Sequence, residues 1–282
     1  MSHCIGKKET VGAALLRLVD DDLAGARAEL AASGRREERI HRARRRLKRA
    51  RTLLRVLEPE FGEAAIAARR SLGAAARLLS RARDADVAAA SARGLAAERA
   101  DVGLDKVVES LDQAATRAHL EKTPSGKVKR QLASVAADVA SFRAGFDGAA
   151  LLNRALARVY GRGRKAMRRS ETTLAMPEIH RWRKEVKHLW HLTQLARKRL
   201  PRDSRGLAEG LERLGEILGL DHDHAMLARK LALSPPGNPS LMRQLSLIAR
   251  RRRALEADAF ALGADIYGKT PKAFARRFHV GR

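Results

Sequence analysis

The sequence is poor in the residues that extracellular, membrane-spanning or strand-rich proteins use in quantity. Cys4 is the only cysteine among 282 residues, so no disulfide can form within the chain. Aromatic residues make up 4% of the chain, whereas Ala, Leu, Arg and Glu are abundant, which is typical of long packed helices. No apolar run approaches the roughly 18 residues of a membrane span, and the first residues contain no signal-peptide core. We therefore expect an all-α, cytoplasmic protein without membrane insertion.

Acidic residues are also scarce. The chain has 32 Asp and Glu against 58 Lys and Arg, which gives a formal charge of +26. Such an excess indicates a polyanionic partner, either nucleic acid, an acidic membrane surface or a phosphate polymer. Single-stranded nucleic acid is usually bound by stacking its bases on aromatic rings, so the low aromatic content argues against that ligand.

Apolar residues at helical spacing divide the chain into predicted helices. The first follows Thr10 as N-cap, and a basic helix over about 36–57 is closed by Pro59. Further helical patterns cover about 61–80, the region from 84, 104–111, 128–142, 151–168, the region from 177, and 207–220. Thr123 with Pro124 predicts another helix start, and the segment 234–240 predicts a turn-rich loop.

The basic run Arg39–Arg55 recurs in altered form as Ile179–His191. One offset of 139 residues relates His41 to His180, Arg44 to Arg183, Lys48 to Lys187, and Asp84 to Asp223. The constant offset predicts an internal duplication into repeats at 1–147 and 148–282, each a bundle of about four helices, with the boundary near Gly145 and Gly148.

Residues three or four apart share a face of a helix, so both basic helices carry a stripe of cations. The first stripe contains His41, Arg44, Arg45, Lys48 and Arg55, and the second contains His180, Arg183, Lys184, Lys187 and His191. Arg42, Arg46 and Arg49 occupy a neighbouring sector of the first helix. Arginine binds phosphate oxygens bidentately and lysine acts as a point charge. A single stripe is usually a solvated face, but its recurrence at the same spacing favours a polyanion held between two walls.

The histidines and aspartates that could act in catalysis or metal binding are more simply explained by structural roles. No carboxylate or nucleophile recurs beside both His41 and His180, so we predict that they bind phosphate or pack inside rather than act as catalysts. Four consecutive residues, 221–224, alternate Asp and His, but neighbours on a helix diverge, so we predict no metal site. Asp84 and Asp223 are predicted to cap helices or to form hydrogen bonds between them. Since no phosphate-binding glycine loop is present, we expect no cofactor.

Five elements in order resemble the CHAD family of α-helical domains. They are the basic segments His41–Arg51 and His180–Lys187, the Arg-Asp-x-Asp-Val segment Arg83–Val87, the segment Leu218–Leu227, and the closing Pro271–Phe274. The resemblance implies two pseudo-symmetric four-helix bundles with a basic central groove or pore that binds inorganic polyphosphate. Carried over by position, His41, Arg44, Lys48, Arg49 and Arg51 would form one wall, and His180, Arg183, Lys184 and Lys187 the other.

The resemblance also implies a stand-alone binding module at polyphosphate granules, not an enzyme. The second wall departs from the family pattern at His188, Trp190 and His191, which implies weaker binding there. Two alternatives stay open: a sequence-independent nucleic-acid-binding protein, and an enzyme that uses histidine to cleave phosphate polymers or phosphoesters.

Overall fold

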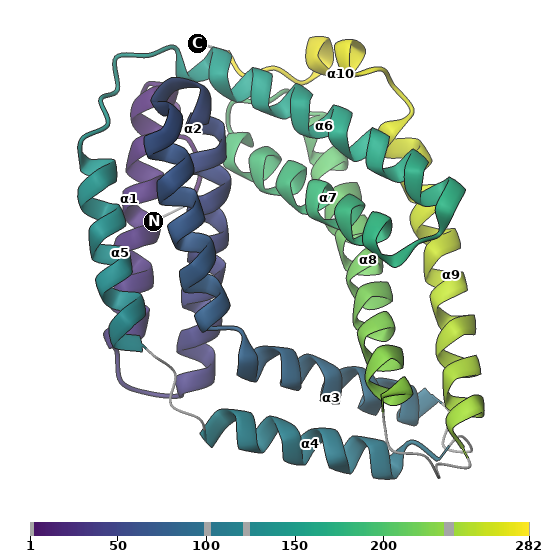
Figure 1. The fold of residues 1–282 in the computed structure, drawn as a ribbon. Helices are drawn as coiled ribbons and strands as arrows, with labels where there is room; N and C mark the ends of the chain where they lie inside the picture. Colours follow the sequence, from purple (N-terminus) through teal and green to yellow (C-terminus); the bar gives the residue numbers. More distant parts are fainter. Residues whose placement is uncertain (1–2, 99–102, 121–124, 234–239, 282) are drawn as a thin grey trace.

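The structure is a computed structural model that describes residues 3–98, 103–120, 125–233 and 240–281. The described residues form helices joined by turns, without strands, which confirms the all-α prediction (Figure 1). The helices are α1 (Val11–Ala31), α2 (Arg36–Leu78), α3 (Arg81–Glu98), α4 (Asp105–Leu120), α5 (Ser125–Ala140), α6 (Gly148–Thr173), α7 (Met176–Ala196), α8 (Ser204–Ala232), α9 (Leu241–Tyr267) and α10 (Pro271–Arg277).

Most helix predictions are confirmed. The side chain of Thr10 accepts a hydrogen bond from the backbone of Ala13, as expected of an N-cap. The predicted start at Thr123 and Pro124, and the predicted loop except for Ser240, lie outside the described residues. Within the described part of the chain, no helix is sufficiently long and apolar to cross a membrane.

The long helix α2 is a hairpin of two helical arms, residues 36–61 and 63–78. Gly62 separates them at φ +51° and ψ −130°, a conformation in which an L side chain is strained, and Pro59 precedes it. The arms run antiparallel, because Arg44 Nη1 donates to the carbonyl oxygen of Ala76 at 2.8 Å. Arg69 pairs with Glu58 nearer the turn. The basic helix thus continues past Pro59, which was predicted to close it, and ends only at Gly62, where the next helix folds back along it.

Two apolar clusters hold the molecule together. The larger one joins α1, α2, α5, α6 and α7 with parts of α8, α9 and α10. The smaller one joins α3 and α4 to α8 and α9; its buried members are Ala92, Leu95, Leu104, Leu227, Leu231, Leu247 and Ile248. The first half of the chain therefore contributes α3 and α4 to a core that is completed by the second half. The division into repeats at 147 and 148, which coincides with the start of α6, stays a prediction.

The helices are arranged as a closed frame (Figure 1). One side contains α1, α2 and α5, the next α6 and α7, the third α8 and α9, and the fourth α3 and α4. Contacts of α2 with α3 and α7, and of α3 with α8, join these sides. The two basic helices, the first arm of α2 and α7, consequently meet at one corner of the frame.

Candidate functional site

One face of the first α2 arm is neutralised by α1. Arg49 donates from Nε to Oδ1 of the fully buried Asp22 at 3.0 Å, and Arg46 lies 3.9 Å from the same oxygen. Arg42 donates to Glu29 at 2.7 Å. These arginines form the neighbouring sector recognised in the sequence, and they attach α2 to α1. Arg49, which the family resemblance placed in the binding wall, is therefore held by a buried carboxylate.

A second face of the arm turns toward the other arm of the hairpin. The guanidinium of Arg51 lies against Gly73, 3.7 Å from the position that a Cβ atom would take. Its Nε is buried and has no hydrogen-bond acceptor among the described residues. Burial lowers the pKa of Arg51, and the charges of Arg69, Arg77 and Arg55 lower it further. Arg51 is thus a half-buried cation surrounded by other cations.

The two basic helices meet through Arg55. Its Nη1 lies 3.0 Å from Nδ1 of His188, and its Nη2 lies 3.9 Å from Oε1 of the buried Glu185. Glu185 also accepts from Nε of Arg162 in α6 at 3.0 Å. Burial would raise the pKa of Glu185, but His188, Arg162 and Arg55 lower it overall. Glu185 was not among the residues predicted from the sequence, although a single acid within the second basic run was the available signal.

The basic stripe of α7 packs against glycines of α8. Arg183 lies 3.6 Å from the position of a Cβ atom on Gly219, and Lys187 lies at the same distance from that of Gly215. Nε of Arg183 is buried without a hydrogen-bond acceptor in the described part of the chain. Packing against α8 partly desolvates both cations and lowers their pKa values, although Lys187 is exposed over much of its side chain. Arg183 and Lys187 of the predicted second wall therefore lie along the contact between α7 and α8.

Carboxylates of α8 oppose the positive charge of this wall. The pKa of Arg183 would be lower still without the charge of Asp223, which partly offsets the effect of burial. Glu216, Glu212 and Asp223 offset the lowering of the Lys187 pKa in the same way. Asp223 lies in the middle of α8, which excludes capping and leaves the predicted role between helices. Its counterpart Asp84 is exposed in the first turn of α3, where its negative charge interacts favourably with the helix dipole.

The histidines of the second stripe are neutral at pH 7. His180 stacks on His222 of α8 with ring centroids 4.5 Å apart. Burial, followed by the charges of Lys184, His222 and Arg183, lowers the pKa of His180 to about 4. Burial, together with nearby cations that include Lys48 of α2, lowers that of His191 to about 3. These rings offer hydrogen bonds but no positive charge, whereas His41 is exposed on the first stripe.

The stability of the fold should therefore decrease in mild acid through His191. Unfolded histidine titrates near 6.5, whereas folded His191 titrates near 3, so the unfolded chain binds more protons between these values. The contribution of His191 is fully present above pH 6.5 and is lost as the pH falls. At pH 5, the stability lost in this way should amount to on the order of 2 kcal/mol. Urea unfolding at pH 7.5 and pH 5 should show a smaller decrease in the free energy of unfolding for His191→Gln than for the unmodified protein. Equal decreases in the two proteins would contradict the assignment.

Four cations complete the predicted set at the surface. Arg45, Lys48, Lys184 and Lys187 are exposed, so ligand can reach them without rearrangement of the fold. The charges of Lys48 and Lys187 both lower the pKa of His191, so the charges of the two stripes lie near one another. The structure thus brings the α2 and α7 stripes together at the corner between these helices.

The alternating Asp and His residues of α8 diverge. Asp221 accepts from Nε of Arg252 in α9 at 2.8 Å, His222 stacks on His180, and His224 is buried. No cluster of three or more His, Cys, Asp or Glu side chains able to hold a metal ion occurs within the described ranges.

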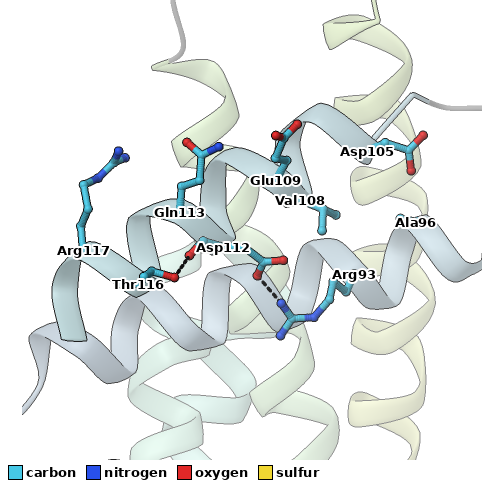
Figure 2. Close-up of a pocket in the computed structure, with 9 residues that line it drawn as sticks. All are labelled: Arg93, Ala96, Asp105, Val108, Glu109, Asp112, Gln113, Thr116 and Arg117. Atoms are coloured by element: carbon cyan, nitrogen blue, oxygen red, sulfur yellow. Dashed lines mark hydrogen bonds and ion pairs between the residues drawn. The ribbon is translucent and has the colours of Figure 1, made fainter. Parts of the chain in front are cut away.

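A hollow of about 980 Å³ lies between α3 and α4 (Figure 2), and its lining residues include none of the basic stripes. Its charged lining residues are Arg93, Asp105, Glu109, Asp112 and Arg117, with Arg93 paired to Asp112. Because carboxylates outnumber arginines in this lining, the hollow does not suit a polyanion.

Comparisons with known proteins identify the family. The family model of the CHAD domain matches residues 14–232, most of the chain. The crystal structure of the CHAD domain from the plant Ricinus communis is 16% identical, with a TM-score of 0.71, and the match covers 100% of this chain and 98% of that one. A search of curated protein sequences found no match. The family match confirms the resemblance, and the structural match shows the same fold. This chain belongs to the CHAD domain family.

Proposed function

We propose that this protein binds inorganic polyphosphate without cleaving it, through the cations of α2 and α7. One observation carries the proposal. Arg51 in α2 and Arg183 in α7 each have a buried Nε that no acceptor satisfies within the described residues. A buried donor without a partner costs about 1–3 kcal/mol, and a phosphate oxygen would remove that cost with a charge-assisted hydrogen bond.

The ligand class follows from the arrangement of these charges. Cations lie at the surfaces between packed helices, where Arg51 and Arg183 are half-buried, and exposed lysines continue both stripes. A thin, flexible polymer with a charge on every phosphate can follow such a path. CHAD domains are associated with polyphosphate binding in general. We extend the proposal to a cytoplasmic protein at polyphosphate granules.

The absence of catalysis is also part of the proposal. His180 stacks on His222, and its pKa of about 4 leaves it neutral and without much basicity at pH 7. His191 has a still lower pKa. A general acid or base works best with a pKa near the operating pH, so neither ring is well placed for acid–base chemistry.

Duplex DNA is the second candidate, because α9 exposes Arg250, Arg251 and Arg253, which belong to neither stripe. Titration of long-chain polyphosphate and duplex DNA at equal phosphate concentration distinguishes the two. We expect tighter binding of polyphosphate, and no release of orthophosphate. Four to six phosphate contacts would raise the dissociation constant roughly 50- to 300-fold between 50 and 200 mM salt. Equal or tighter binding of DNA would overturn the proposal.

A further inference from the structure

The open end of the α2 hairpin gathers arginines from both arms. Arg44 of the first arm is bonded to the carbonyl oxygen of Ala76 in the second, and Arg51 lies against Gly73. Arg77 follows Ala76 in the last turn of the second arm and is exposed. A cation in the last turn of a helix also interacts favourably with the unpaired carbonyl groups there. Folding at Gly62 thus places Arg77 beside the stripe of the first arm.

The charges around the two walls differ. Arg51 is acted on by Arg55, Arg69 and Arg77, and the carboxylate that pairs with Arg69 is Glu58, nearer the turn of the hairpin. In the second wall, by contrast, Lys187 packs 3.6 Å from the Cβ position of Gly215 in α8, which lies between Glu212 and Glu216 in the sequence. The charges of Glu212, Glu216 and Asp223 favour the charged form of this lysine. The second arm of α2 therefore adds cations beside the first wall, whereas α8 adds carboxylates beside the second.

We infer that the α2 hairpin, through Arg51 and Arg77, is the stronger phosphate anchor, and that Glu212 and Glu216 weaken the wall formed by α7 and α8. This inference rests on the proposed function and assigns Arg77 to the site for the first time. A phosphate at the open end would meet the fork of Arg51 from one arm and that of Arg77 from the other. The same phosphate near Lys187 would meet two carboxylates, which repel it.

Substitutions in the hairpin test the first part of the inference. Loss of a charge-assisted hydrogen bond predicts that Arg51→Gln weakens polyphosphate binding about 10- to 30-fold. Arg77→Glu replaces attraction with repulsion at an exposed position and should weaken binding about 5- to 10-fold. Arg253→Glu is the matched control, since it makes the same charge change at an exposed position on α9, and should change affinity less than about twofold. Circular dichroism and thermal unfolding would show that Arg77→Glu keeps the fold.

Removal of the α8 carboxylates tests the second part as a gain. Glu212 and Glu216 are exposed, so Glu212→Gln with Glu216→Gln should leave the fold intact. We expect polyphosphate to bind about 3- to 10-fold more tightly to this double variant. When Lys187→Gln is added, most of the gain should disappear, because the carboxylates act through that lysine.

The outcomes separate this inference from the proposed function. Failure of the unmodified protein to prefer polyphosphate over DNA would remove the proposed function itself. If the unmodified protein binds polyphosphate but Arg77→Glu behaves as Arg253→Glu does, the hairpin anchor is wrong. If Glu212→Gln with Glu216→Gln leaves affinity unchanged, the α8 carboxylates do not weaken the second wall and the inference fails in its second part.

Discussion

The combination of Lys48→Glu and Lys187→Glu should weaken polyphosphate binding about 30- to 150-fold, which corresponds to roughly 2–3 kcal/mol. Each substitution removes an attraction and adds a repulsion at an exposed position, one on each stripe. Both lysines act on the same ring, His191, so their charges converge on one place. The measurement is a titration of fluorescently labelled polyphosphate at fixed ionic strength.

The control makes the same charge change elsewhere. Arg251→Glu with Arg253→Glu alters two exposed positions of α9, one of which pairs with Glu98. It should weaken binding less than about threefold, because diffuse surface charge is screened by salt. Comparable losses in the two double variants would mean that net charge attracts the polymer and that the corner between α2 and α7 is no defined site.

Replacement of Asp22 by Ala should lower the free energy of unfolding by about 3 kcal/mol. Asp22 is fully buried and is contacted by Arg49, by Arg46, and by His3 at 2.7 Å. Without the carboxylate, Arg49 would remain partly buried and would lose its ion pair with Asp22. Urea unfolding followed by circular dichroism measures the effect.

Asp21→Ala provides a matched control on the same helix. Asp21 pairs with Arg17 at 2.9 Å, but both side chains are about two-fifths exposed, at 44% and 40%. Exposed pairs contribute about 0–1 kcal/mol, so this variant should remain close to the unmodified protein in stability. Similar destabilisation by both replacements would argue that burial of Asp22 has no special role in holding α2 on α1.

Helix positions and the two basic stripes could be predicted from local information. Apolar spacing revealed the helices, and Pro59 together with the next apolar pattern showed that the basic helix stops before the following one begins. The recurrence of His41, Arg44 and Lys48 at a fixed offset was enough to identify the second stripe. Each helix and each stripe depends on residues within one or two helical turns, and the repeat is found by comparing two stretches of sequence. A sequence displays both directly.

The roles of individual arginines could not be predicted in the same way. Arg49 and Arg51 are two residues apart in one basic run, yet Arg49 meets Asp22 of α1 and Arg51 meets the second arm of α2. Which partner each one finds depends on how three helices pack, and so does the link from Arg55 to Glu185. The same reason hid Arg77, whose relation to the stripe exists only after the chain reverses at Gly62.

The shared core of α3, α4, α8 and α9 has a consequence for synthesis of the chain. Leu104 and Leu227 belong to the same small cluster but are separated by more than a hundred residues of sequence. At a translation rate of about 5–20 residues per second, roughly 6–25 s pass between their appearance. During this interval, the apolar faces of α3 and α4 lack the partners that later cover them. The apolar surface of the nascent first half therefore stays uncovered, and the frame closes only when α8 and α9 have been made.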